Sequence, residues 1–205
     1  MKITTTTMLT LDGVMQGLGA PDEDRRGGFE RGGWQAPTWD DEAGTFLNQV
    51  YSRAGAYLFG RWTYEIFARH WGAMAADPGG NPIAVALNTK PKYVASTTLT
   101  AATWPGTTVL SADLASAIAT LKAEPGGELQ VHGSGTLLRW LLANRLVDEM
   151  NLLISPVILG QGTRLFPGTG PDMALDLVES RSTPKGNTIQ IYRPAGRPRY
   201  ARADA

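Results

Sequence analysis

The chain has 205 residues, of which 42% are hydrophobic, which is enough for one globular domain with a sizeable core. Its 19 basic residues balance 19 acidic residues, so the net charge favours neither a nucleic-acid partner nor an acidic membrane surface. The chain has no cysteine and only two histidines, which excludes disulfides, thiolate catalysis and cysteine-ligated zinc, and disfavours a histidine-held metal.

The N-terminal residues are rich in threonine and lack the apolar run of a signal peptide. No stretch of the sequence approaches the length of a membrane span. We therefore expect a cytoplasmic protein without a membrane partner. We expect one domain over residues 1–194, followed by a polar tail over residues 195–205 that contains Arg197-Pro198-Arg199.

The first predicted element is a strand, because Ile3 to Leu11 alternates and is rich in β-branched residues. From Gly13 to about Asp41 no helical or strand period persists, and glycines and prolines recur. So long an irregular segment inside a compact domain is typical of a lid or binding loop. Because this loop contains Trp34 and Trp39, which are poorly suited to water, we expect them to line a substrate pocket.

The remaining elements alternate between helix and strand before the chain ends in strands alone. Thr38 or Asp40 can cap a helix that continues to about Arg53. The sequence then predicts a strand at 56–59, a helix from Gly60-Arg61, a turn at 77–81, a helix at 82–88, strands at 92–95 and 107–110, a helix at 112–123, a strand at 129–131, a helix from Thr136 to Leu142, a long strand at 147–159 and a hairpin of 175–180 with 188–192. Pro156 suggests an edge or a bulge in the long strand. This order predicts an α/β fold with a mostly parallel central sheet and antiparallel C-terminal strands.

A glycine-rich turn, His132-Gly133-Ser134-Gly135, joins the strand at 129–131 to the following helix. Such a turn aims unpaired backbone N–H groups and the positive end of the helix dipole at one point, where an anion can bind. Glycine also lets a phosphate approach the backbone closely. We interpret the turn as a pyrophosphate cradle, with an ordinary turn that binds no ligand as the alternative. It is not the dinucleotide fingerprint, because Leu138 stands where a third glycine is needed.

Polar groups also follow two other predicted strands, at Gly60-Arg61 and at Ser96-Thr97. Ligands of open α/β sheets bind beyond the carboxyl ends of the strands, so these groups and the glycine-rich turn are expected to converge. Arg61 and the hydroxyl groups of Ser96 to Thr98 can hold a further phosphate. An adenine dinucleotide with a 2′-phosphate matches this distribution.

Several short motifs in this order resemble the dihydrofolate-reductase-like superfamily. They are Thr10-Leu11-Asp12-Gly13, Gly60-Arg61-x-Thr63-Tyr64-Glu65, Lys92-Tyr93-Val94-x-Ser96, Val131-His132-Gly133-Ser134-Gly135, Val147-Asp148-Glu149, Pro156-Val157-Ile158-Leu159-Gly160-x-Gly162 and Arg164-Leu165-Phe166. The most similar branch is the reductase domain of the bifunctional riboflavin-biosynthesis deaminase-reductase. The resemblance covers roughly Met1 to Pro194.

The resemblance implies a dihydrofolate-reductase-like three-layer sandwich and NADPH-dependent hydride transfer to a pyrimidine-like or pteridine-like small molecule. The implied activity is similar to that of 5-amino-6-(5-phosphoribosylamino)uracil reductase in riboflavin biosynthesis. The residues near the adenosine 2′-phosphate would be Gly60, Arg61, Thr63, Ser96 and Thr97. The residues at the pyrophosphate would be Gly133, Ser134, Gly135, Thr136 and Leu137.

The resemblance also implies a proton-relaying or substrate-orienting acid after the mobile loop, where Asp40 and Asp41 are the candidates. Asp12, at the end of the first strand, is a further candidate for a catalytic acid. The alternative roles are helix capping for the first two and turn capping for Asp12. The family and the apolar segment Leu152 to Leu159 predict a homodimer.

The sequence leaves two other functions open and excludes a third. A dihydrofolate reductase proper and a non-catalytic NADPH-binding protein on the same fold stay open as alternatives. A serine hydrolase is excluded, because His132 stands where a nucleophile elbow needs glycine and no histidine follows Ser134.

Overall fold

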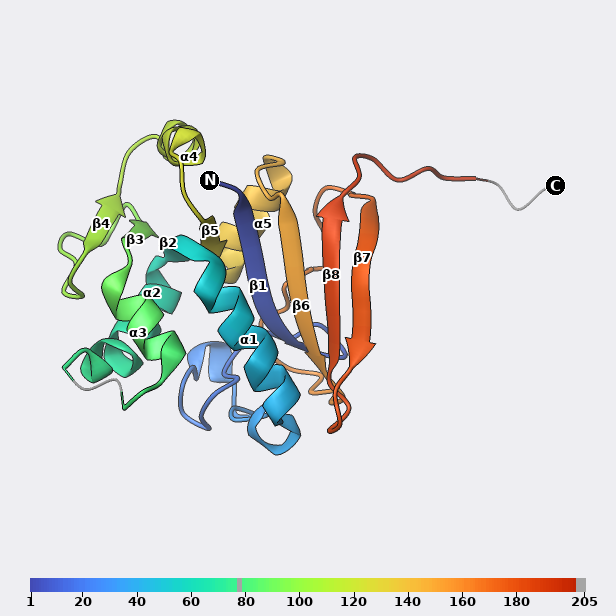
Figure 1. The fold of residues 1–205 in the computed structure, drawn as a ribbon. Coiled ribbons are helices and arrows are strands. Elements are labelled where there is room, and N and C mark those ends of the chain that lie inside the picture. Colours follow the sequence, from blue (N-terminus) through green and yellow to red (C-terminus); the bar gives the residue numbers. More distant parts are fainter. Residues whose placement is uncertain (77–78, 202–205) are drawn as a thin grey trace.

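The computed structural model of the protein describes residues 1–76 and 79–201. Within these residues, eight strands form one sheet in the order β4-β3-β2-β5-β1-β6-β8-β7 (Figure 1). The pairs from β4 through to β6 are parallel, whereas β8 runs antiparallel to both β6 and β7. The predicted α/β fold, with a mostly parallel sheet and antiparallel C-terminal strands, is confirmed.

The strands are β1 (Ile3–Thr10), β2 (Ala54–Gly60), β3 (Lys92–Ala95), β4 (Thr107–Leu110), β5 (Glu128–Val131), β6 (Glu149–Ser155), β7 (Leu175–Ser182) and β8 (Thr188–Pro194). The helices are α1 (Asp41–Arg53), α2 (Arg61–His70), α3 (Pro82–Thr89), α4 (Leu114–Ala123) and α5 (Gly135–Ala143). Short 3₁₀ turns occur at Arg26–Gly28, Ala36–Thr38 and Gly72–Met74.

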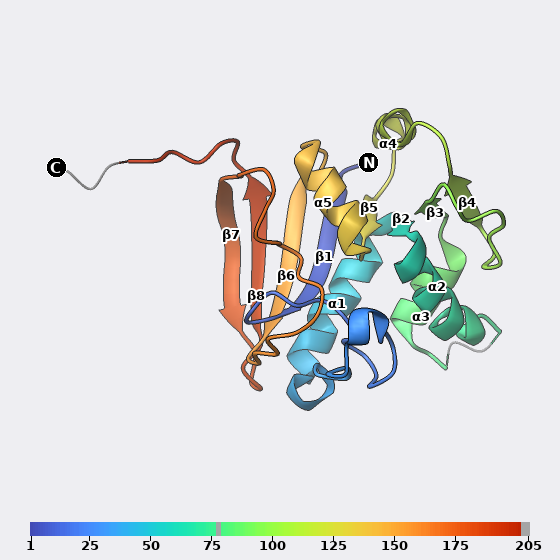
Figure 2. The same ribbon diagram turned by 180° about the vertical axis from the view of Figure 1, so that it is seen from behind.

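The helices bury both faces of the sheet, which gives three layers. One apolar cluster joins α1, α2 and α3 to residues such as Phe59 and Leu153 on one face. A second cluster joins α4 and α5 to residues such as Leu58 and Leu152 on the other face. Figure 1 shows α1 in front of the sheet, and Figure 2 shows α5 on the opposite side. Alternate residues of each strand therefore supply opposite cores, as the period of two in a strand requires.

Most helix starts follow local rules that are visible in the sequence. The Asp40 carboxylate accepts a hydrogen bond from the Ala43 amide at 2.9 Å and begins α1, as predicted. Asn81 caps α3, and Pro82 occupies its first position. Asp113 caps α4, which therefore begins at Leu114 rather than at the predicted residue 112. Two helices, α2 and α5, have no side-chain cap.

The prediction of a long strand with an edge or a bulge at Pro156 was wrong. Strand β6 ends at Ser155 and lies between β1 and β8 in the interior of the sheet. Proline has no amide hydrogen, so Pro156 ends the pairing instead of placing the strand at an edge. Residues 152–154 are thus paired with strands on both sides. This part of the segment Leu152 to Leu159 cannot form a subunit interface. The predicted turn at 77–81 lies partly outside the described residues.

The end of the chain contacts the loop that precedes β7. The Ala195 amide donates to the Ala174 carbonyl at 2.8 Å, and the Tyr200 hydroxyl donates to Asp172 Oδ2 at 2.9 Å. Division into a domain over residues 1–194 and a tail over 195–205 stays a prediction. No helix in the described ranges is long and apolar enough to cross a membrane.

An aromatic layer between α1 and the sheet encloses His132, the last residue before the glycine-rich turn. The Tyr51 ring stacks on the imidazole with 4.5 Å between centroids, and the Tyr57 ring lies 6.1 Å away. Desolvation among these rings lowers the pKa of His132 to about 3. The imidazole is therefore neutral at physiological pH.

This burial predicts that acid destabilises the protein through His132. Below the ordinary histidine pKa of about 6.5 the unfolded chain binds a proton that the folded chain does not, so stability is lost as pH falls. Between about pH 7 and pH 5 this loss should reach about 2 kcal/mol. His132→Phe retains a ring against Tyr51 but cannot titrate. Between pH 7 and pH 5 this variant should therefore lose about 2 kcal/mol less stability than the wild type. Urea unfolding at both pH values measures the difference, with His70→Gln as control. Equal losses in wild type and His132→Phe would contradict the assignment.

We propose that the protein forms a homodimer through strand β7 rather than β6. Strand β7 lies at the edge of the sheet and exposes Leu177 and Val178, with 57% and 47% of their surfaces accessible. An exposed apolar edge strand is a template for pairing with another chain. Light scattering at micromolar concentration should give a dimer for wild type and a monomer for Leu177→Lys. Val85→Lys, on the exposed side of α3, should remain dimeric. A monomeric wild type would overturn the proposal.

Candidate functional site

Two helix N-termini meet at the carboxyl ends of the neighbouring strands β2 and β5. Gly60 ends β2 and precedes α2, and Ser134 precedes α5. The Gly60 amide donates to the Gly133 carbonyl at 3.0 Å. A Cβ atom on Gly60 would lie 2.2 Å from Ser134 Oγ and 3.0 Å from the Ser134 amide nitrogen. Only glycine at position 60 therefore allows the two helix starts to approach this closely.

The first-turn amides of both helices point away from any capping side chain. Neither Gly60 nor Ser134 makes a side-chain cap hydrogen bond. In α5 the Leu138 amide donates to the Ser134 carbonyl at 2.9 Å, so the amides of Gly135, Thr136 and Leu137 precede the first amide that donates within the helix. The positive ends of the two helix dipoles lie at the same place as these amides. Together they form a site suited to an anion.

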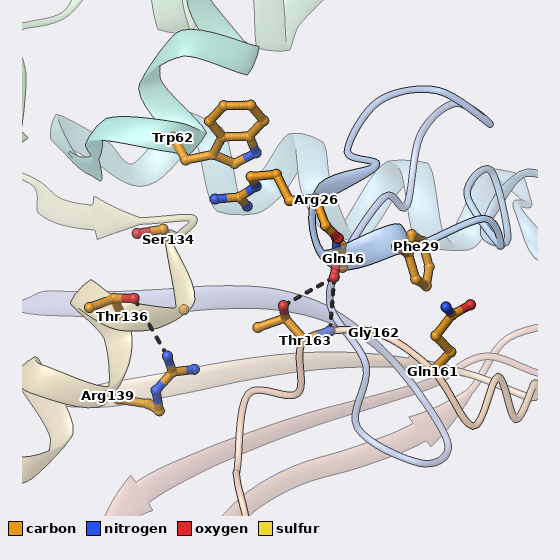
Figure 3. A pocket seen from close by; sticks show the side chains of 12 residues that line it. Gln16, Arg26, Phe29, Trp62, Ser134, Thr136, Arg139, Gln161, Gly162 and Thr163 are labelled. Carbon is orange, nitrogen blue, oxygen red and sulfur yellow. Dashed lines mark hydrogen bonds between the residues drawn. The ribbon is translucent and has the colours of Figure 1, made fainter.

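A cavity of about 530 Å³ opens in front of the α5 N-terminus (Figure 3). Its walls come from the long loop, from both helix starts and from the segment after β6. The residues that line it are Gln16, Arg26, Gly27, Phe29, Trp62, Ser134, Gly135, Thr136, Arg139, Gln161, Gly162 and Thr163. This set includes Arg139 and also Arg26, whose guanidinium is paired with the Asp24 carboxylate at 2.5 Å. Because no carboxylate lines the cavity itself, the described lining favours a polar, negatively charged ligand.

The buried Gln16 side chain holds the long loop over this cavity. Its Nε2 donates to the carbonyls of Asp24 and Arg26, at 3.2 and 2.9 Å. Its Oε1 accepts from the Thr163 amide and the Thr163 hydroxyl, each at 3.0 Å. One side chain thus joins two turns of the loop to the segment on the other side of the cavity. The predicted irregular segment is accordingly an ordered wall of the site.

The structure brings most of the predicted cofactor residues together. Gly60 and the turn Gly133 to Thr136 surround the junction of α2 and α5. Thr63 lies against this turn, because a Cβ atom on Gly133 would be 2.6 Å from Thr63 Oγ1. The Leu137 side chain is buried in the core, so that residue can offer only its backbone amide. Binding of a cofactor here stays a prediction.

Arg61 and the segment after β3 also meet, beside the start of α2. Arg61 Nη1 donates to Thr98 Oγ1 at 2.8 Å, and its Nε donates to Glu65 Oε1 at 2.7 Å. Ser96 Oγ accepts from the Thr98 amide at 3.2 Å, whereas Thr97 is exposed. Thr98 is thus in more direct contact with Arg61 than Ser96 or Thr97. None of these residues lines the cavity described above, so they form a separate, solvent-facing part of the site.

Asp12 is a structural acceptor at the end of β1. Its carboxylate accepts from Thr10 Oγ1 at 2.6 Å, from the Gly160 amide at 2.9 Å and from Arg164 Nη2 at 3.1 Å. Desolvation raises the pKa of Asp12, but these hydrogen bonds outweigh it and hold the pKa well below its ordinary value. Asp12 therefore remains ionised near neutral pH and joins β1 to the segment after β6.

Asp40 is likewise occupied by hydrogen bonds, and neither it nor Asp41 lines the described cavity. Besides the Ala43 amide, the Asp40 carboxylate accepts from Thr183 Oγ1 at 2.6 Å and from the Lys185 amide at 2.9 Å. Desolvation raises the pKa of Asp40, but the hydrogen bonds dominate and lower it. Asp41 is exposed in the first turn of α1. The geometry matches the capping alternative for Asp40, and a catalytic role for any of the three acids stays a prediction.

The tryptophans occupy places that the sequence did not predict. Trp34 is buried with Val14 and Phe29 in a small core under the loop, and its Nε1 donates to the Gln16 carbonyl at 2.8 Å. Trp39 is partly exposed and lies beside Gly44 of α1. Neither lines the described cavity. Trp62 lines it instead.

Sequence reasoning also missed Gln16, Arg26, Arg139, Gln161 and Thr163 as lining residues. Arg139 could have been found, because it lies one helical turn after Gly135 and so shares a face with the start of α5. The others lie on irregular segments, where no period indicates direction. No cluster of three or more histidine, aspartate or glutamate side chains placed to hold a metal occurs in the described part of the chain.

Comparison with known proteins agrees with the fold. The uncharacterized protein YyaP of Bacillus subtilis (strain 168) is 25% identical over 147 residues, which span 72% of this chain and 76% of YyaP. A proposed riboflavin biosynthesis protein from Shewanella sp. PV-4 superposes with a TM-score of 0.71 at 22% identity, over 95% of this chain and 99% of that protein. A pyrimidine reductase-like protein from Corynebacterium diphtheriae superposes with a TM-score of 0.62 at 15% identity, over 94% and 91% of the two chains.

The sequence model of one family, the RibD C-terminal domain, matches residues 1–189 and so includes every strand of the sheet from β1 to β7. This agrees with the sequence motifs that resemble the reductase domain of the riboflavin-biosynthesis deaminase-reductase. The chain belongs to the RibD C-terminal domain family.

Proposed function

We propose that the protein is an NADPH-dependent reductase that transfers a hydride to a pyrimidine-like or pteridine-like small molecule. The observation that carries the proposal is the meeting of two uncapped helix N-termini at a cavity whose described lining holds arginines and no carboxylate. Membership of the RibD C-terminal domain family supports a reductase of the riboflavin-biosynthesis type. The names of the two structural relatives point in the same direction.

The residues present fit a dinucleotide. The backbone amides of Gly135, Thr136 and Leu137 would bind the pyrophosphate, because they lack protein acceptors and lie at the positive end of the α5 dipole. Arg139, whose Nη1 would lie 3.0 Å from a Cβ atom on Gly135, adds a positive charge beside them. When bound, the nicotinamide supplies the hydride, so the protein contributes orientation, charge and exclusion of water.

The adenosine 2′-phosphate would bind at the separate cluster of Arg61 and Thr98. Glu65 accepts from only one of the five N–H donors of the Arg61 guanidinium, and Thr98 uses another. The remaining donors and the Ser96–Thr98 hydroxyl groups would hold a phosphate from one side. This assignment distinguishes NADPH from NADH, which lacks that phosphate.

None of the three candidate acids lines the described cavity, and a role for any of them in supplying the accompanying proton stays a prediction. Asp12 and Asp40 are held ionised by hydrogen bonds, and Asp41 lies outside the described cavity. The neutral polar lining includes Gln161 and Thr163, whose donors bond to the Gly28 carbonyl and to Gln16 Oε1 within the protein.

The direct test of the function is calorimetric titration with NADPH, followed by an absorbance assay of its oxidation with pyrimidine and pterin substrates. Binding together with turnover supports a reductase. Binding without turnover across such a panel would favour the non-catalytic alternative, and lack of binding would overturn the proposal.

Gly135→Val should raise the dissociation constant for NADPH at least about 100-fold, because its side chain would occupy the space in front of the first α5 amides. The fold should survive, since a Cβ atom there would meet only the ends of two flexible side chains, Arg139 and Met15, at 3.0 Å each. Ser134→Ala should have a much smaller effect, because its hydroxyl caps no amide and the backbone persists. Calorimetry and thermal melts of both variants check this order. Unchanged NADPH binding by a folded Gly135→Val would contradict the cradle.

Arg61→Ala should weaken NADPH binding by about 1.5–3 kcal/mol and leave NADH binding nearly unchanged, because a charge-assisted contact to the 2′-phosphate is lost. Dissociation constants for both cofactors measure the selectivity. Arg69→Ala, near the other end of α2, serves as the control. Equal weakening of NADH and NADPH would show that Arg61 does not contact the 2′-phosphate.

A further inference from the structure

Met15 is a half-buried methionine of the long loop that lies against the first residue of α5. A Cβ atom on Gly135 would lie 3.0 Å from Met15 Sδ and also 3.0 Å from Arg139 Nη1. The backbone of Met15 is fixed, because its amide donates to the Thr163 carbonyl at 2.9 Å. The thioether is therefore held beside the start of α5, where only the side chain can turn.

The donors around this sulfur lack a strong acceptor in the protein. Ser134 caps no amide of α5, and the first three amides come before the one that first donates within the helix. In the described chain the Arg139 side chain donates only to neutral oxygens, the Arg164 carbonyl at 3.2 Å and Thr136 Oγ1 at 3.5 Å. A thioether is a weak acceptor, so Met15 leaves these donors available to a ligand.

Oxidation changes this sulfur from a weak acceptor into a strong one. A lone pair of the sulfur attacks one oxygen of hydrogen peroxide, the O–O bond breaks, and that oxygen stays on the sulfur as S=O. The other oxygen leaves as water after it takes the proton of the first. The sulfur loses two electrons, the peroxide gains them, and an apolar side chain becomes polar. Three rotatable bonds let the methionine side chain turn the new oxygen toward nearby donors.

We propose that Met15 is a redox-sensitive modification site, at which a peroxide forms a sulfoxide that closes the anion site of α5. The sulfoxide oxygen accepts from the first-turn amides and from Arg139, and so takes the donors that an anionic ligand needs. The identity of the displaced ligand, NADPH, rests on the proposed function, whereas the capping of α5 by the sulfoxide does not. Reduction by a dithiol-dependent sulfoxide reductase would return the thioether, with water and a disulfide as the other products.

The first test compares wild type and Met15→Leu before and after hydrogen peroxide, with oxidation at each methionine measured by mass spectrometry. Met15 should be oxidised, whereas Met150, which is 2% exposed, should stay a thioether. Oxidised wild type should bind NADPH at least about 10-fold more weakly than untreated wild type. The same treatment should leave the affinity of Met15→Leu unchanged. Met74→Leu, which removes another half-buried methionine, should respond as the wild type does.

A measurement without ligand separates this proposal from the function. Oxidation of Met15 should slow hydrogen exchange of the Gly135 to Leu137 amides about 10-fold in the ligand-free protein, because a cap protects them. Met15→Gln, whose amide oxygen stands in for S=O, should weaken NADPH binding without any oxidant.

A Met15 that stays reduced under peroxide would overturn the proposal, as would full NADPH affinity in folded protein oxidised at Met15. Failure of the untreated wild type to bind NADPH would overturn the proposed function. In that case, slower exchange of the α5 amides after oxidation would still support the modification site, and unchanged exchange would overturn it as well.

Discussion

The close contact between Gly60 and Ser134 determines the geometry of the candidate site. Strands β2 and β5 are parallel neighbours, so they deliver the starts of α2 and α5 to the same edge of the sheet. A Cβ atom on Gly60 would lie 2.2 Å from Ser134 Oγ and 3.0 Å from the Ser134 amide nitrogen, so the serine side chain and its backbone would have to shift. Because both N-caps lack capping bonds, the approach concentrates unpaired amides and two dipole ends at one point. The cavity, its polarity and the candidate cofactor residues follow from this arrangement.

The long loop becomes a wall of the site because its polar groups are satisfied by specific partners. An irregular segment lacks the regular backbone hydrogen bonds of a helix or a sheet. Its buried N–H and C=O groups therefore need hydrogen-bond partners from other parts of the protein. Gln16 supplies both, to two turns of the loop and to Thr163. Phe29 and Trp34 provide a small separate core beneath the loop. The polar contacts of Gln16 and the apolar cluster of Phe29 and Trp34 thus both hold the loop in place.

The net charge of the protein is zero, but its acidic and basic side chains lie in different places. Asp12 and Asp40 accept several hydrogen bonds each and serve as structural anions that join loops to strands and helices. Arg26 and Arg139 line the cavity, where no carboxylate faces a ligand in the described residues. A site of this kind favours a negatively charged ligand through electrostatics. The hydrogen bonds of Asp12 and Asp40 therefore give these candidate acids a structural role that needs no part in the chemistry.

The sequence by itself determined the order of elements, the parallel sheet with its antiparallel end and the position of the glycine-rich turn, because these depend on local periodicity, capping residues and glycine. Asp40 as a helix cap and Gly133 to Gly135 as a βα turn are local features of this kind. Only the tertiary structure decided which side chains meet. Pro156 ends an interior strand because β8 adds beyond β6, which no local pattern reveals. Trp62 faces the cavity and Trp34 the core because the folded loop passes over α2, and an irregular segment has no period from which such a direction can be read.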